Sequence, residues 1–237
     1  MRLSSPIYKL KHRAKLLARD NGIKLNAALN QIAQTEGYKG WSHLASSYTK
    51  ATTAEKILRQ IRTSDMVLIG ARPRHGKTLL GLELTALAAN INRTGYFFTL
   101  DYNEAEVWKR LGKLGPDTDK LKHSITVDAS DHICAPYIIE RLSRKPADAL
   151  IVIDYLQLLD QKRDNPPLDE QVCALKKFAT EHGAIIIITS QIHRTFDLSQ
   201  SNIPSSNDIH LPNLVELSLF DKRYFLHDGE IRVELAA

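Results

Sequence analysis

Three local patterns follow one another at residues 66–90, and together they leave few possible folds. An apolar segment of strand length, Met66–Gly70, runs into the loop Ala71-Arg-Pro-Arg-His-Gly-Lys-Thr78, and a helical pattern then covers residues 77–90. A loop placed between a buried strand and a helix can direct backbone N–H groups at a phosphate. The positive end of the helix dipole favours the same anion. The order therefore predicts a phosphate-binding loop at the edge of a sheet.

The residue types in this loop suit a nucleoside triphosphate. Gly76 has no side chain to block the approach of a phosphate, and Lys77 supplies a positive charge for the β- and γ-phosphates. The Thr78 hydroxyl is a ligand for Mg²⁺. The pattern usually begins with Gly, whereas this chain has Ala71. The alternative is a chance match in an ordinary strand–helix turn. The predicted nucleotide-binding residues are Ala71, Arg72, Pro73, Arg74, His75, Gly76, Lys77, Thr78 and Leu79.

From residue 65 onward, apolar segments alternate with helical patterns. The predicted strands are Met66–Gly70, Tyr96–Asp101, Ser124–Val127, Ala149–Asp154 and Ala184–Ser190, and the helices cover about 77–90, 103–113, 134–143 and 168–181. Continuous apolar strands between amphipathic helices are typical of a parallel sheet that helices cover on both faces. We therefore predict an α/β fold with a mostly parallel central sheet. Three terminal strands are also predicted, at Val215–Leu219, Tyr224–Leu226 and Ile231–Leu235, with a hairpin turn at His227–Glu230.

Polar residues at the carboxyl ends of three predicted strands are candidates for catalysis. Asp154 ends an apolar strand, and a carboxylate there lies beside the phosphate site of an α/β sheet and can hold Mg²⁺. Asp101 is a candidate for orienting the attacking water, and Gln191 for sensing the γ-phosphate. The alternatives are a turn-capping role for Asp154, a helix N-cap for Asp101 and an ordinary loop position for Gln191.

The N-terminal part of the chain differs in charge from the rest. Of the 32 Lys and Arg residues, 12 lie in residues 1–62 together with three of the 27 Asp and Glu residues, so this part is basic and the remainder is acidic. Such asymmetry indicates a polyanionic partner such as nucleic acid. We predict a small helical module at 1–50, a linker and lead-in helix at 51–64, and an ATPase domain at 65–237.

A basic stripe is predicted on the first helix of that module, over residues 6–20. Lys11, Lys15 and Arg19 recur at intervals of four, apart from the apolar positions of the helix. They are candidates for nucleic-acid contacts, and Arg194 is a further candidate. The alternative for the stripe is an ordinary solvated helix face.

Other features favour a cytoplasmic protein. No apolar run approaches the roughly 18 residues that a membrane span needs, and the first residues contain no apolar signal-peptide core. The two cysteines, Cys134 and Cys173, match no metal-binding spacing and are expected to be reduced thiols.

The chain resembles the motor domain of the DnaB-type replicative helicases, within the RecA-like ATPase superfamily. The resemblance rests on Ala71-Arg-Pro-Arg-His-Gly-Lys-Thr78, on Ile153-Asp-Tyr-Leu-Gln-Leu158 and on Ser190-Gln191 followed by Arg194. It covers residues 65–194. It implies a RecA-like core, hydrolysis of ATP with Mg²⁺, DNA as partner, and a ring or filament with sites between subunits.

The chain also departs from that family. Asp101 stands where the family has its catalytic Glu, and the small basic module stands where the family has its N-terminal collar. The resemblance does not identify a finger residue that acts on a neighbouring subunit; Lys222, Arg223 and Arg232 are the candidates. The leading hypothesis is an ATP-driven DNA helicase or DNA-associated motor. The alternatives are a regulatory ATPase of the KaiC or RadA kind, and a protein that binds ATP without turnover.

Overall fold

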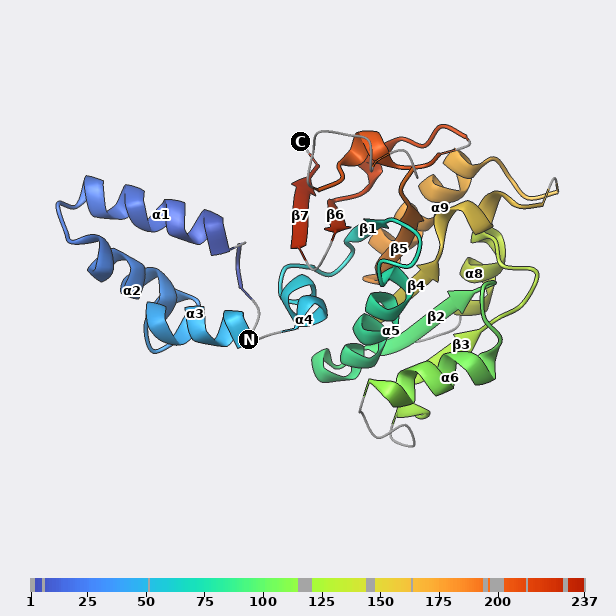
Figure 1. Ribbon diagram of the computed structural model, residues 1–237, viewed down its shortest axis with the longest axis horizontal. Coiled ribbons are helices and arrows are strands. Elements are labelled where there is room, and N and C mark those ends of the chain that lie inside the picture. The colour runs from blue at the N-terminus through green and yellow to red at the C-terminus, as the bar shows by residue number, and fades with distance from the viewer. Residues whose placement is uncertain are drawn as a thin grey trace. The chain divides into compact units, whose positions relative to one another are not determined.

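The chain divides into two compact units, residues 1–61 and 62–237 (Figure 1). The computed structural model describes residues 3–5, 7–50, 52–114, 121–143, 148–162, 164–193, 196, 203–211, 213–227 and 230–236. The limits predicted for a module, a linker and a main domain, namely 1–50, 51–64 and 65–237, stay a prediction. No helix in the described ranges is both long and apolar enough to cross a membrane.

The first unit is helical. It contains α1 (Ile7–Asp20), α2 (Leu25–Thr35), α3 (Trp41–Lys50) and α4 (Thr53–Leu58). The small core of the first three helices consists of Leu3, Leu10, Ala14, Ala28, Ile32, Ala33, Tyr38 and Leu44. Two polar side chains set helix starts: Asn30 Oδ1 accepts the backbone N–H of Trp41 at 2.9 Å, and Thr52 forms a capping box with Glu55 at α4. The first helix was predicted at 6–20 and is observed at Ile7–Asp20.

The second unit is built on a seven-stranded sheet in the order β3-β2-β4-β5-β1-β6-β7. The strands are β1 (Met66–Ala71), β2 (Thr94–Thr99), β3 (Ile125–Asp128), β4 (Ala149–Asp154), β5 (Ile185–Gln191), β6 (Lys222–His227) and β7 (Glu230–Leu235). All neighbours pair in parallel except β6 and β7, which are antiparallel with His227 opposite Glu230. The predicted mostly parallel sheet is confirmed.

Helices cover both faces of this sheet (Figure 1). The helices and short 3₁₀ segments are α5 (Lys77–Leu87), η1 (Ala88–Ile91), α6 (Glu104–Lys113), α8 (Ala135–Leu142), η2 (Leu156–Asp160), α9 (Leu168–His182), η4 (Ser206–Asp208) and η5 (Leu217–Leu219). The side chains of α8 and α9 form one core with Tyr96, Ile151 and Ile188. On the other face, α5 lies so close to the sheet that a Cβ on Gly81 would be 3.0 Å from Val152.

The strand predicted at Val215–Leu219 is wrong. Leu217–Leu219 is a 3₁₀ turn, because Leu219 and Phe220 donate their N–H groups to carbonyls three residues back, those of Glu216 and Leu217. The edge of β1 that such a strand might have paired with is occupied by β6. Arg223 donates to the Leu217 carbonyl oxygen at 2.8 Å, so a side chain satisfies that group instead of a neighbouring strand.

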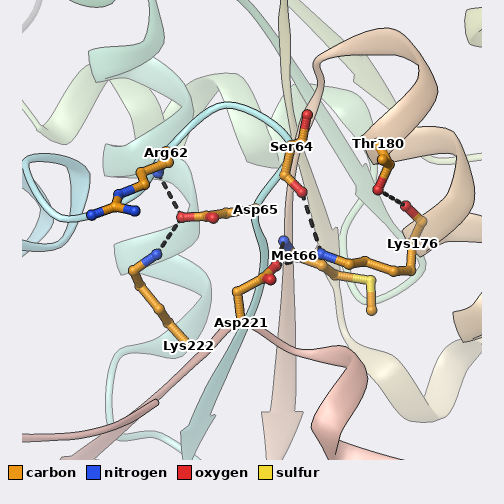
Figure 2. A network of polar contacts seen from close by, with 8 residues as sticks. All are labelled: Arg62, Ser64, Asp65, Met66, Lys176, Thr180, Asp221 and Lys222. Carbon is orange, nitrogen blue, oxygen red and sulfur yellow. Dashed lines mark hydrogen bonds and ion pairs between the residues drawn. The ribbon is translucent and has the colours of Figure 1, made fainter. Parts of the chain in front are cut away.

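Two ion pairs join the amino ends of β1 and β6 to each other and to α9 (Figure 2). Asp65 accepts hydrogen bonds from the Lys222 ammonium group and from the backbone N–H of Arg62. Asp221 accepts the N–H of Met66 at 2.7 Å and pairs with Lys176 at 2.6 Å. These residues lie at the edge of the sheet opposite the loop that follows β1.

A buried glutamine stabilises the other helical face. Gln171 is only 1% exposed; its Oε1 accepts the N–H of Ala135 at 2.9 Å, and its Nε2 donates to the carbonyls of Leu159 and Pro166 at 2.7 and 2.8 Å. One side chain thereby satisfies three main-chain groups from α8, η2 and the segment before α9.

We expect Gln171→Met to lower the free energy of unfolding by about 3 kcal/mol. The substitution preserves the volume but leaves three main-chain groups unpaired, and each such buried group costs roughly 1–3 kcal/mol. In thermal unfolding, the midpoint should fall by about 6–12 °C for a domain of this size. Gln161→Met, at an exposed glutamine, is the control. A midpoint equal to that of the control would contradict the role assigned to Gln171.

Candidate nucleotide-binding site

The loop after β1 has the backbone conformation that a phosphate-binding loop requires. β1 ends at the buried Ala71, and α5 begins at Lys77 with Gly76 as its N-cap. Gly76 has φ +82°, in the left-handed region where a side chain is strained, although a Cβ there would meet no atom within 4 Å. Arg74 also has a positive φ, +67°. The amides at the start of α5 can therefore face an anion without obstruction.

Strand alternation brings Asp154 to the same face of the sheet as α5. Val152, two residues earlier on β4, lies against Gly81 of α5, and Asp154 shares its face because side chains two residues apart point the same way. Asp154 is fully buried, with 0% exposure. Its Oδ1 accepts a hydrogen bond from Thr189 Oγ1 at 2.6 Å. The last residue of β4 thus lies beside the first turn of the loop helix.

The pKa of Asp154 is raised, mainly because burial disfavours the charged carboxylate. The hydroxyls of Thr189 and Thr78 and the positive charge of Lys77 act in the opposite direction, while the nearby Asp101 adds to the increase. Thr78 and Asp154 are therefore side by side, and that the two residues share one metal ion stays a prediction.

The carboxylate of Asp154 also fits a cation. Its second oxygen, Oδ2, is buried and makes no hydrogen bond of normal geometry with any described residue. A buried carboxylate oxygen without a donor is costly, and a hard cation with oxygen ligands removes that cost. A threonine hydroxyl beside an aspartate is a donor set that suits Mg²⁺. No cluster of three or more His, Cys, Asp or Glu side chains suited to a metal occurs in the described part of the chain.

Lys77 lies over the ring of Tyr155, with Nζ 5.0 Å from the ring centre. This distance is within the range of a cation–π contact. Tyr155 follows Asp154 directly, and its own pKa is raised by burial first and then by the charges of Asp101 and Asp154. The sequence reasoning did not single out Tyr155, although its position after the strand-ending aspartate was visible.

Asp101 lies on the loop after β2, one strand away from Asp154. It is exposed, and its N–H donates to Thr99 Oγ1 at 3.2 Å. It is close enough to Asp154 and Tyr155 for its charge to raise the pKa of both. The N-cap of α6 is Asn103, whose side chain accepts the N–H of Glu106. The helix-capping alternative for Asp101 therefore does not apply.

Gln191, the last residue of β5, is next to the start of the loop. The parallel pairing of β1 with β5 places Gln191 opposite Ala71 and Ser190 opposite Gly70. β5 itself lies between β1 and β4 in the sheet. The strand that carries Gln191 therefore separates the strand of the phosphate loop from the strand of Asp154.

The remaining predicted residues lie elsewhere. Lys11, Lys15 and Arg19 are exposed on α1 of the first unit. Arg194 is outside the described residues. Of the three finger candidates, Lys222 and Arg223 are bound within the chain, to Asp65 and to the carbonyls of Leu217 and Leu235. Arg232 is exposed and makes one long hydrogen bond, 3.4 Å, to the carbonyl oxygen of Ile203.

Two polar residues of the site were missed by the sequence reasoning. Thr189 holds the carboxylate of Asp154, and Gln157 bonds to Ser190 beside Gln191. A signal for Thr189 existed, because it follows four isoleucines and is the first polar residue of a buried strand. Gln157 lay within the matched motif, but its partners come from segments distant in the sequence.

Comparison with known proteins finds similarity to replicative DNA helicases. The family model described as DnaB-like helicase C terminal domain matches residues 112–216, which include Asp154 and Gln191 and leave out the loop at 71–79. The replicative DNA helicase DnaB of Geobacillus stearothermophilus is 26% identical over 220 residues, which are 77% of this chain and 48% of that protein. The DnaB of Treponema pallidum is 27% identical over 223 residues, or 80% and 50%. The chain thus spans about half the length of the curated relatives it matches.

Solved structures show the same fold. The ATPase domain of G40P has a TM-score of 0.59 at 23% identity and covers 76% of this chain and 79% of its own. A DnaB-like replicative helicase, solved to study its interactions with primase, has a TM-score of 0.61 at 20% identity, with 98% and 70% covered. Residues 62–237 therefore have a RecA-like fold and resemble the motor domain of the DnaB-type replicative helicases.

Proposed function

We propose that the chain binds ATP with Mg²⁺ at the loop after β1 and hydrolyses it, as a DnaB-like DNA helicase or DNA-associated motor. The observation that carries the proposal is the adjacency of Thr78 and Asp154, with one carboxylate oxygen of Asp154 buried and making no hydrogen bond of normal geometry with any described residue. The proposed nucleotide-binding residues are 71–79, and the proposed metal ligands are Thr78 and Asp154.

Each group of the loop has a defined task in this proposal. The amides that open α5 at Gly76 bind the β-phosphate, and the helix dipole adds to their attraction. Lys77 neutralises negative charge on the β- and γ-phosphates. This charge grows on the leaving group as the bond to the γ-phosphate breaks. Thr78 and Asp154 would hold Mg²⁺, which would offset the negative charge of the phosphates. Thr189 fixes the orientation of Asp154 through the 2.6 Å hydrogen bond.

Asp101 and Gln191 are the proposed groups on the γ-phosphate side. Asp101 would orient the attacking water, and its exposure and proximity to Asp154 support that position. It is one methylene shorter than glutamate, so its reach toward the water is shorter, and a misplacement of about 1 Å costs on the order of a hundredfold in rate. Gln191 would sense the γ-phosphate from the end of β5, next to Ala71.

The proposed setting is a cytoplasmic homo-oligomer, either a ring or a filament. The curated relatives are replicative DNA helicases, and this supports DNA as the partner. The second candidate function is a regulatory ATPase whose nucleotide state controls assembly without unwinding. The observation that favours it is the short carboxylate of Asp101, which predicts slow turnover.

One experiment separates these functions. The rate of phosphate release is measured with and without single-stranded DNA, together with the mass of the protein with and without ATP. Stimulation of the rate by DNA supports the motor. Assembly that depends on ATP, with no effect of DNA, supports the regulator. Binding of ATP without phosphate release would contradict the proposed enzyme.

The exposed face of α1 is the proposed nucleic-acid contact. Its apolar face is already used, because Leu10 and Ala14 are fully buried in the core of the first unit. Among the described residues neither Lys11 nor Lys15 has an ion-pair partner, and Arg19 pairs only with the adjacent Asp20 at 3.1 Å. At a rise of about 1.5 Å per residue, the three cations extend over about 12 Å, which suits a line of phosphates.

We expect replacement of Lys11, Lys15 and Arg19 together by Ala to weaken binding of single-stranded DNA at least tenfold. It should also reduce the slope of log K against log salt by about 2, because each lost phosphate contact removes about 0.7. Fluorescence anisotropy over a range of salt concentrations measures both. The control replaces Lys109, Lys113 and Lys162, three exposed lysines of the second unit, and changes the net charge equally. Equal losses in both variants would exclude a specific role for α1.

A further inference from the structure

β5 extends past its neighbour β4 toward the nucleotide site. The pairing of β4 with β5 ends at Ile153 and Ile188, whereas the pairing of β1 with β5 continues to Ala71 and Gln191. The last part of β5 therefore has a strand on one side only. On the other side its main-chain groups need other partners, since buried N–H and C=O groups are rarely left unpaired.

The side chain of Gln157 lies along this open edge. Gln157 follows Asp154 by three residues and belongs to η2. Its Oε1 accepts the backbone N–H of Gln191 at 3.5 Å, and its Nε2 donates to Ser190 Oγ at 3.2 Å. The same Nε2 donates to the carbonyl oxygen of His210. The amide thus takes the place of a neighbouring strand at the end of β5.

The carbonyl of His210 belongs to the segment 203–211, which returns to the end of β5. His210 donates its N–H to the carbonyl of Gln191 at 2.8 Å, and His193 donates to the carbonyl of Asp208 at 2.9 Å. Ile192 and Ile209 form an antiparallel bridge between these contacts. The end of β5 and the segment 203–211 are therefore joined beside Gln191, and Gln157 bonds to both.

The chemistry of these partners requires an amide. The carbonyl of His210 can only accept a hydrogen bond, and the N–H of Gln191 can only donate one. A side chain that serves both must therefore carry a donor and an acceptor on one short group. Methionine offers neither, and an ionised glutamate offers only the acceptor.

We propose that Gln157 is a positioning residue that fixes the main chain of Gln191 and the returning segment 203–211 relative to Asp154. The inference rests on the proposed function, because it treats Gln191 as the group that senses the γ-phosphate. Loss of the amide leaves the nucleotide loop intact and changes the geometry only on the γ-phosphate side. The effect therefore appears in kcat for ATP hydrolysis and not in KM.

The test compares Gln157→Met, Gln157→Glu and the control Gln161→Met, each in the full chain. We expect Gln157→Met to lower kcat tenfold to a hundredfold with KM for ATP changed less than twofold, since a shift of about 1 Å has an effect of this size. Hydrogen exchange in the protein without nucleotide should be about tenfold faster at the amides of Gln191 and His210. Gln157→Glu, which keeps the acceptor, should fall between Met and the wild type. The control should match the wild type in both measurements.

Several outcomes would overturn the inference. One is wild-type kcat and wild-type exchange in Gln157→Met. Another is faster exchange over the whole sheet, which would mean general destabilisation, and a third is a loss of kcat with no change in exchange near Gln191. If the wild type itself releases no phosphate, the proposed function fails, whereas the exchange measurement still decides whether Gln157 holds Gln191 in place.

Discussion

Replacing Lys77 by Ala should abolish tight binding of ATP and its hydrolysis. Lys77 is the first residue of α5, and its charge is close enough to Asp154 to oppose the increase that burial causes in the pKa of that carboxyl. Hydrogen bonds to charged groups are worth about 1.5–3 kcal/mol each, and this ammonium group serves two phosphates. We therefore expect ATP affinity to fall by about a hundredfold or more, with no measurable phosphate release.

The measurement is equilibrium binding of a fluorescent ATP analogue together with a phosphate-release assay. Lys109→Ala, at an exposed lysine of α6, is the matched control and should bind like the wild type. DNA binding by Lys77→Ala should be unchanged, because the basic face of α1 lies in the other unit of the chain. Wild-type ATP affinity in Lys77→Ala would mean that the nucleotide binds elsewhere.

Asp154→Asn should remove turnover while most nucleotide affinity remains, and it should stabilise the protein in the absence of Mg²⁺. The loop amides and Lys77 still bind the phosphates, but a neutral amide is a poor ligand for a hard cation. The hydrogen bond from Thr189 is preserved, since Asn retains an oxygen in that position. Turnover is measured as phosphate release at saturating ATP.

The effect on stability depends on pH in a defined direction. Burial raises the pKa of Asp154 in the folded protein, so the carboxyl holds its proton more tightly there than in the unfolded chain. The stability that this tighter proton binding contributes is fully present at pH values below the ordinary carboxyl pKa. It is lost as pH rises through the raised pKa of Asp154 in the folded protein. At pH values above the raised pKa the wild type therefore carries a buried charge that Asn lacks. We expect a gain on the order of 1 kcal/mol, or about 2–4 °C in the unfolding midpoint.

Thermal unfolding of both proteins in a metal chelator, over a range of pH, tests this prediction. The difference between the Asp154→Asn variant and the wild type should be small in acid and should grow as pH rises. Adding Mg²⁺ should stabilise the wild type and leave the variant unchanged. A variant that is less stable than the wild type at the highest pH of the range would show that the carboxylate is satisfied within the chain and has no need of a cation.

Much of the second unit could be predicted from sequence because its signals are local. A buried parallel strand is a short apolar run, and β1, β4 and β5 were each placed within about two residues for this reason. The position of Asp154 beside Thr78 also followed from simple rules. The carboxyl ends of parallel strands meet at one edge of the sheet, and alternation decides which face a residue occupies.

The remaining features depend on contacts between distant segments. Apolar and polar residues alternate at 215–219, and this pattern is compatible with a strand as well as with the 3₁₀ turn that is observed. Only the pairing of β6 with β1 decides between the two. Periodicity marks the helix position of Gln171 as buried. It cannot show that the side chain there makes three hydrogen bonds. Gln157 likewise has partners 33 to 53 residues away. Such contacts become visible only when the fold is known.

The ion pairs at the amino ends of β1 and β6 have a mechanical consequence. Asp65 and Lys222 are only 11% and 12% exposed, so salt screens their attraction weakly, and both strands are anchored at that edge. At the opposite edge of the sheet, beside the nucleotide loop, the end of β5 is held by hydrogen bonds with the side chain of Gln157. If the chain hydrolyses ATP as proposed, we expect movement coupled to phosphate release at the carboxyl ends of the strands, because these ion pairs hold their amino ends.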